Sequence, residues 1–164
     1  MDKDNIMSES RHILVVDDEE DVRDTLQNVL KSMNYIPYTA AGGAEALEII
    51  KNNKIDVVLS DLYMPEMDGI ELLKKVRSQE KQVIFLMITA HPTIETAVEA
   101  IKKGAYDYLT KPFHIEEVRM KINRALEKKG LTHSLKTANG IIWALLISIP
   151  IWLVLGIILA SILS

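Results

Sequence analysis

The sequence of 164 residues contains no cysteine. This absence excludes disulfide bonds, metal sites built from thiolates and cysteine nucleophiles. Positive charge is not in excess either, because 19 Lys and Arg stand against 23 Asp and Glu, a net charge of −4. General binding to nucleic acid is therefore not expected. The chain also lacks a GxxxxGK[ST] sequence, which excludes P-loop kinases and phosphatases.

Charge is missing altogether from the last part of the sequence. Residues 137–164 contain no charged side chain, and residues 141–163 contain 19 hydrophobic residues out of 23. As a helix, this segment would rise about 35 Å, enough to cross a hydrocarbon core of about 30 Å. A buried core helix is the alternative, but such a helix usually keeps a polar stripe. The sequence therefore predicts a transmembrane helix over residues 141–163.

The charges before this segment predict its orientation. Only Ser164 follows it, whereas five cationic residues precede it closely: Lys121, Arg124, Lys128, Lys129 and Lys136. The positive-inside rule then predicts a single-pass protein of the cytoplasmic membrane with its charged domain in the cytoplasm. Gly156 and Ala160 have the spacing of small residues that pack two membrane helices together, so a homodimer is one expected state. Residues 1–10 are expected to form a flexible arm and residues 130–140 a short linker.

Between residues 11 and 129, short apolar runs alternate with amphipathic stretches. The apolar runs predict strands over residues 12–16, 36–40, 57–60, 83–89 and 106–109. The amphipathic stretches predict helices over residues 21–33, 44–51, 70–77, 94–103 and 115–128. Five strand-then-helix units indicate an α/β domain, (βα)5, with a doubly wound five-stranded parallel sheet covered on both faces.

Polar residues follow four of the predicted strands: Asp17, Asp18, Asp61, Thr89 and Lys111. Ligands of open parallel sheets bind beyond the carboxyl ends of the strands, so these residues are candidates for one site. Three carboxylates would repel each other without a cation, and oxygen donors suit Mg²⁺. Lysine pairs with phosphoryl oxygens, and an aspartate can become an aspartyl phosphate. Simpler interpretations exist for each residue alone, such as a helix cap at either early aspartate.

The sequence around these residues carries four motifs: VVDDEE (15–20), LSDLYMPEMDGIELL (59–73), ITA (88–90) and YDYLTKPF (106–113). With these motifs, residues 11–129 resemble the receiver domain of two-component response regulators, most closely the nitrogen-regulation type. The resemblance implies the flavodoxin-like receiver fold. It also implies that Asp61 accepts a phosphoryl group from the histidine of a sensor kinase or a phosphotransfer protein.

The same resemblance implies a role for each of the other polar residues. Mg²⁺ would be held by Asp17, Asp18, Asp61 and the backbone carbonyl of Tyr63. Lys111 would hold the phosphoryl group, and its bond to Pro112 would be cis.

Two further residues would form the switch. Thr89 would move to bind the phosphoryl group once it is present, and Tyr108 would turn inward as it does. A plain core position is the alternative for Tyr108.

The expected function is that of a membrane-anchored receiver in a two-component phosphorelay, with an unidentified downstream protein partner. It would not be an enzyme beyond its own phosphoryl transfer and slow autodephosphorylation. Alternatives are a docking module that works without phosphorylation and a truncated regulator without output. An aspartate-based phosphohydrolase would commonly need a second acid where Tyr63 stands. A flavin-binding domain of similar architecture would be yellow when purified.

Overall fold

The computed structural model describes residues 11–79 and 82–128. The predicted arm over 1–10, the linker over 130–140 and the apolar segment over 141–163 lie outside these residues. The chain divides into two units, Met1–Ala125 and Leu126–Ser164. Within the described ranges, no helix is both long enough and apolar enough to cross a membrane.

Five strands form one sheet, as the alternating pattern predicts. They are β1 (His12–Val16), β2 (Ile36–Ala40), β3 (Val57–Asp61), β4 (Ile84–Thr89) and β5 (Asp107–Thr110). All neighbouring strands are parallel, in the order β2-β1-β3-β4-β5. Each strand begins and ends within one residue of its predicted bounds, so the predicted five-stranded parallel sheet is confirmed.

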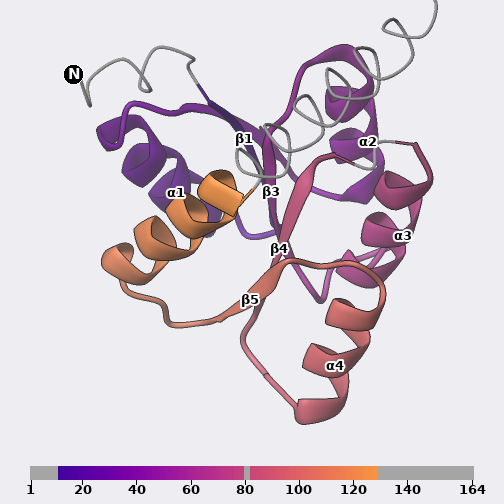
Figure 1. Ribbon diagram of the computed structural model, residues 1–164. Coiled ribbons are helices and arrows are strands. Elements are labelled where there is room, and N and C mark those ends of the chain that lie inside the picture. The colour runs from indigo at the N-terminus through magenta and orange to yellow at the C-terminus, as the bar shows by residue number, and fades with distance from the viewer. Residues whose placement is uncertain (1–10, 80–81, 129–164) are drawn as a thin grey trace, which may run out of the picture. The chain divides into compact units, whose positions relative to one another are not determined.

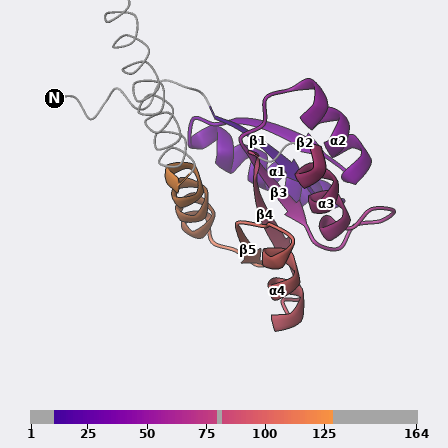
Figure 2. The ribbon, with the colours of Figure 1, turned by 45° about the vertical axis from the view of Figure 1, so that its right-hand side comes forward.

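The helices connect these strands and cover both faces of the sheet. They are α1 (Glu20–Ser32), α2 (Gly43–Asn52), α3 (Gly69–Gln79), α4 (Ile94–Lys102) and a helix over residues 115–128, which is the last one in the described residues and is called the last helix below. Figure 1 shows α1 and the last helix, in orange, on one side of the sheet, with α2, α3 and α4 on the other. Figure 2 shows the same division after the turn of the molecule.

The core follows from the two-residue period of the strands. Leu14, Val16 and Phe85 belong to one buried cluster that includes side chains of α2 and α3. Their neighbours Ile13 and Val15 are also fully buried, and side chains alternate between the two faces of a strand. Both faces are therefore apolar, which explains why the strands have continuous hydrophobic runs instead of alternating ones.

The strand order determines where a ligand site can form. β1 lies between β2 and β3. The chain adds β2 on one side of β1 and then adds β3, β4 and β5 on the other side. At such a point the loops that follow β1 and β3 diverge and leave room beyond the carboxyl ends of the strands. The predicted site residues belong to these loops and to the ends of β4 and β5.

Candidate phosphoacceptor site

The loop after β1 is organised around Asp17, whose side chain is fully buried. Its Oδ1 atom accepts a hydrogen bond from the backbone amide of Glu19 at 3.0 Å. The guanidinium of Arg23 donates to the backbone carbonyls of Asp17 at 2.7 Å and Asp18 at 3.0 Å. Glu19 is the N-cap residue of α1, and no side chain of the described residues caps that helix. Asp17 therefore shapes the loop with one oxygen and leaves the other for the site.

Lys111 lies at the centre of the site. Its Nζ atom is 2.8 Å from Asp17 Oδ2, 3.0 Å from Asp61 Oδ2 and 3.3 Å from Glu19 Oε1. Burial by itself lowers the pKa of Lys111, but hydrogen bonds from its ammonium to Asp17 and Asp61 raise the pKa by more, above the ordinary value of 10.5. Lys111 therefore remains a cation among three carboxylates.

Asp61 is the last residue of β3, and its side chain is 9% exposed. Its Oδ1 accepts a hydrogen bond from the backbone amide of Leu62 at 2.7 Å, while Oδ2 faces Lys111. α3 packs closely behind it, because a Cβ atom at Gly69 would overlap the backbone carbonyl oxygen of Asp61 and crowd Met87 Sδ. The carboxylate is thus fixed in direction and reachable from the loop side.

Thr89 ends β4 and is almost completely buried. Its Oγ1 atom accepts a hydrogen bond from the backbone amide of His91 at 3.1 Å. Its backbone carbonyl accepts one from the amide of Lys111 at 2.8 Å, and the carbonyl of Ile88 accepts one from Leu62 at 2.8 Å. These backbone contacts bring the ends of β3, β4 and β5 together, as the strand pattern predicts.

Tyr108 lies on β5 at the surface, 38% exposed, and not in the core. Its ring is 5.7 Å from the ammonium of Lys121 on the last helix. The peptide bond between Lys111 and Pro112 is cis, as expected.

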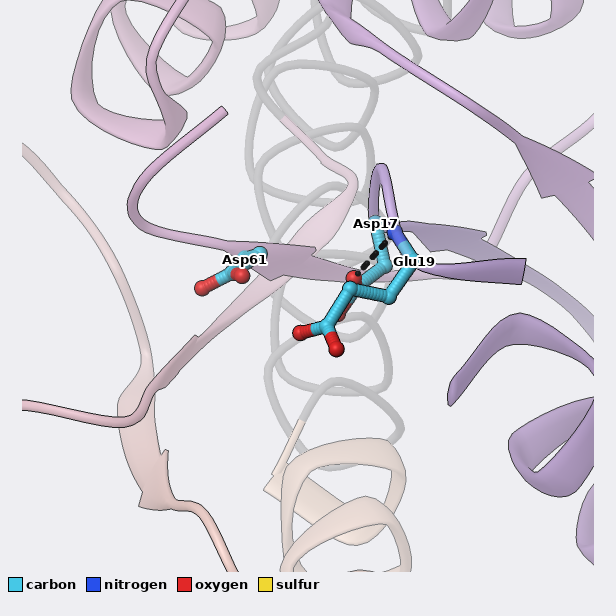
Figure 3. Close-up of side chains that lie close together, drawn as sticks. All are labelled: Asp17, Glu19 and Asp61. Carbon is cyan, nitrogen blue, oxygen red and sulfur yellow. Dashed lines mark hydrogen bonds between the residues drawn. The ribbon is translucent and has the colours of Figure 1, made fainter. Parts of the chain in front are cut away.

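Three carboxylates could share a metal ion. Oxygen atoms of Asp17, Glu19 and Asp61 all lie within 4.8 Å of one another (Figure 3). Asp17 Oδ2 is buried and faces the ammonium of Lys111 at 2.8 Å, and no hydroxyl or backbone amide of the described residues donates to it. Burial raises the pKa of Asp17 above its ordinary 3.8, although the Lys111 ammonium partly offsets this. The carboxylate oxygens of Asp17, Glu19 and Asp61 are hard donors of the kind that Mg²⁺ prefers, and one of them, Asp17 Oδ2, is buried.

This group differs from the predicted ligand set. Glu19 was not predicted, although it is the third acid of the VVDDEE motif. The side chain of Asp18 is exposed, and the acidic group found among the described residues does not include it. Tyr63 lies two residues after Asp61 and is 55% exposed. The roles of Asp18 and Tyr63 as ligands stay predictions.

Comparison with known proteins agrees with this geometry. Residues 13–123 match the family model "Response regulator receiver domain". The chain is 38% identical over 130 residues to the regulatory protein AtoC of Escherichia coli, covering 79% of this chain and 28% of AtoC. It is 39% identical over 114 residues to the DNA-binding transcriptional regulator NtrC of Escherichia coli, covering 70% of this chain and 24% of NtrC. The chain thus spans about a quarter of the length of these relatives.

A solved structure is similar over its whole length. The beryllofluoride-activated NtrC4 receiver domain dimer has a TM-score of 0.69 and 37% identity, covering 72% of this chain and 98% of that chain. The match therefore extends over a complete receiver domain, and the family model over residues 13–123 includes the acidic site. Receiver domains of this family are regulatory phosphoacceptors that use Mg²⁺ at such a site, and this chain belongs to the response regulator receiver family.

Proposed function

We propose that Asp61 of this chain is phosphorylated by the phosphohistidine of a sensor kinase or a phosphotransfer protein. The observation that supports this most is the position of Lys111, whose ammonium lies 3.0 Å from Asp61 and 2.8 Å from Asp17. The carboxylates of Asp17 and Asp61 are costly to place beside one mostly buried cation for stability alone, because these groups lose most of their water. Such an arrangement is typical of a site that binds a charged group.

The transfer forms one bond and breaks one. A carboxylate oxygen of Asp61 attacks phosphorus, the phosphorus–nitrogen bond of the phosphohistidine breaks, and its electron pair stays on the imidazole, which takes up a proton. Mg²⁺, when bound, would neutralise charge on the phosphoryl oxygens. The ammonium of Lys111 would pair with one phosphoryl oxygen, and the Thr89 hydroxyl would donate to another.

Intact mass measurement tests the proposal directly. The full chain, kept in mild detergent, is incubated with acetyl phosphate with and without Mg²⁺. We expect a gain of one phosphoryl group that needs Mg²⁺ and is absent in Asp61→Asn. The matched control is Asp24→Asn on the exposed surface of α1, which should be phosphorylated normally. If neither acetyl phosphate nor a panel of phosphorylated kinases modifies Asp61, the chain is a docking module that works without phosphorylation.

We propose that Glu19 shares the metal site with Asp17 and Asp61, and that Asp18 is a ligand as well. The side chain of Glu19 is 65% exposed and 3.3 Å from Lys111, so it can turn toward an incoming ion at little cost. Glu19→Gln and Asp18→Asn are compared by the Mg²⁺ concentration that gives half-maximal phosphorylation. A ligand role predicts a rise of about tenfold or more for the variant concerned. An unchanged requirement in one variant removes that residue from the ligand set.

We also propose that residues 141–163 anchor the receiver in a membrane, with the receiver on the cytoplasmic side. The support is the sequence of this segment, which lies outside the described residues, together with the cations before it. The full chain should remain in the membrane pellet after carbonate extraction. A chain that ends at residue 136 should be released. Release of both would refute the anchoring.

The downstream partner would bind the surface of α4 and β5. Ile94, Val98 and Ile101 are exposed along α4, and Tyr108 is exposed on β5. The matched NtrC4 receiver is a dimer in its beryllofluoride-activated form, so we propose a second copy of this chain as the first candidate. Sedimentation in detergent with and without beryllofluoride tests this. A mass that doubles with beryllofluoride, and does not in Ile94→Glu, supports it, whereas an unchanged mass points to a different protein partner.

A further inference from the structure

One ion pair holds Tyr108 at two places. The Oδ1 atom of Asp107 accepts a hydrogen bond from the backbone amide of Tyr108 at 2.7 Å. The Oδ2 atom of the same carboxylate lies 2.6 Å from Nζ of Lys121. That ammonium is in turn 5.7 Å from the centre of the Tyr108 ring. The backbone and the ring of Tyr108 are therefore both in contact with the Asp107–Lys121 pair.

This contact is not an ordinary surface ion pair. The side chain of Lys121 is only 18% exposed and that of Asp107 is 35% exposed, so water screens the pair less than it screens a pair on the open surface. A lysine ammonium within about 6 Å of a ring centre is attracted to the ring face, and more strongly when it is partly desolvated. Asp107 fixes the ammonium in place, which reduces the entropy that the contact with the ring would otherwise cost.

Tyr108 also borders a second environment. A small, mainly apolar pocket is lined by both Tyr108 and Thr89. The other lining residues are Leu62, Met87, Pro92, Thr96, Ala97 and Ala100. The ring thus lies between two places that favour it for different reasons. Lys121 attracts it at the outer surface, and the pocket beside Thr89 offers apolar contacts.

We propose that Lys121 is a positioning residue that holds the Tyr108 ring in its outer position and so sets how readily the chain switches. An interaction present in only one of two states shifts the population toward that state. Removal of the Lys121 charge therefore raises the fraction of molecules with the ring turned inward, even without phosphate. By reciprocity, it also raises the affinity of the site for any ligand that favours the inward position. The second consequence rests on the proposed function, but the first does not.

The role could not be predicted from sequence position. Lys121 lies 13 residues after Tyr108, on a helix that only the folded chain brings beside β5. As sequence, it counts merely as one of several cations before the apolar segment. The structure places its ammonium inward against β5, in contact with Asp107.

The test follows the ring directly. The full chain in detergent is labelled with 3-fluorotyrosine, and the ¹⁹F resonance of Tyr108 is assigned with Tyr108→Phe. Beryllofluoride with Mg²⁺ marks the switched position. Lys121→Met, which keeps the length but removes the charge, should move the resonance toward that position and raise the inward-to-outer ratio about two- to fivefold. Lys121→Arg should restore the resonance. Lys74→Met, at an exposed lysine of α3, should leave it unchanged.

A second measurement separates positioning from general stabilisation. Lys121→Met should raise the affinity for beryllofluoride by the same two- to fivefold, and should add nothing when Tyr108 is already replaced by Leu. An unmoved resonance in Lys121→Met overturns the proposal, as does an equal gain in affinity in the Tyr108→Leu background. If beryllofluoride binds no variant, the proposed phosphoacceptor function fails, whereas the shift of the resonance between Lys121→Met and Lys121→Arg still decides the role of Lys121.

Discussion

α3 and α4 follow neighbouring strands that both end in site residues, yet the two helices are packed very differently. α3 follows β3, which ends in Asp61. Five residues of α3 are buried: Gly69, Ile70, Leu72, Leu73 and Val76. α4 follows β4, which ends in Thr89, and of its described residues only Ala100 is buried. Ile94 of α4 is 80% exposed.

The difference in buried contacts predicts that the two helices differ in how easily they move. Segments with few buried apolar contacts open at lower free energy than segments that belong to the core. α3 therefore holds Asp61 in a fixed position, whereas α4 can change position at small cost. A hydrogen-bonded Thr93–Thr96 capping box fixes where α4 begins, so the helix is well formed although it is loosely attached.

The largest expected difference is between substitutions of an apolar residue in each of the two helices. Leu72→Ala should lower the free energy of unfolding by about 2–5 kcal/mol, because Leu72 is fully buried and leaves a cavity. Val98→Ala should lower it by about 0.5 kcal/mol or less, since Val98 is 45% exposed. Urea unfolding followed by circular dichroism measures both. Equal losses would remove the contrast between the helices.

Arg77 is a test of how α4 is attached. Its guanidinium donates to the carbonyl of Gly104, just after α4, at 2.8 and 3.0 Å, and to that of Val83 at 2.7 Å. Arg77→Met should cost about 1–3 kcal/mol, since charge-assisted hydrogen bonds are lost. It should also speed amide exchange at the carboxyl end of α4 more than in α3. Arg77→Lys serves as the control. If the exchange rate changes equally in both helices, Arg77 does not stabilise the attachment of α4 in particular.

Thr89→Ala tests whether α4 responds to the site. With beryllofluoride and Mg²⁺, we expect amide exchange in α4 to change about tenfold and exchange in α3 to stay nearly constant, equivalent to about 1.4 kcal/mol in local opening. Thr89→Ala removes one donor to the bound group, so it is compared at saturating beryllofluoride, where it should lose most of the response in α4. Hydrogen exchange with mass spectrometry gives both values. A full response in Thr89→Ala would exclude the threonine from the coupling.

The smallest effect is expected on the other side of the sheet. The Tyr35 hydroxyl donates to Asn123 Oδ1 at 2.7 Å and joins the connection between α1 and β2 to the last helix. Burial raises the pKa of Tyr35 above its ordinary 10.0, although Arg119 and Arg11 oppose this. Because the folded pKa exceeds the unfolded one, the stabilisation is present below pH 10 and is lost as the pH rises through the folded pKa. Unfolding free energy should therefore fall more steeply above pH 10 in the wild type than in Tyr35→Phe, and parallel slopes would contradict this.

The strands and the polar residues at their ends could be predicted from local sequence. The continuous apolar runs of β3 and β4 predict buried parallel strands, and Asp61 and Thr89 follow from the ends of those runs. Glu19 could not be placed, because whether an acid beside Asp17 points into the site depends on the turn that the Asp17 carboxylate stabilises. The weak packing of α4 could not be predicted from the sequence either, because its apolar residues have the same helical spacing as those of α3.

Lys111 pairs with Asp61 and with Glu19, residues 50 and 92 positions earlier in the chain. β5, which ends just before Lys111, is an edge strand and the last strand along the described part of the chain. Contacts between residues so far apart form late, because a long loop must close before they can be made. A growing or cleaved chain that lacks β5 therefore keeps its carboxylates but has no lysine between them. If Asp61 accepts a phosphoryl group as proposed, phosphorylation assisted by Lys111 would require the completed domain.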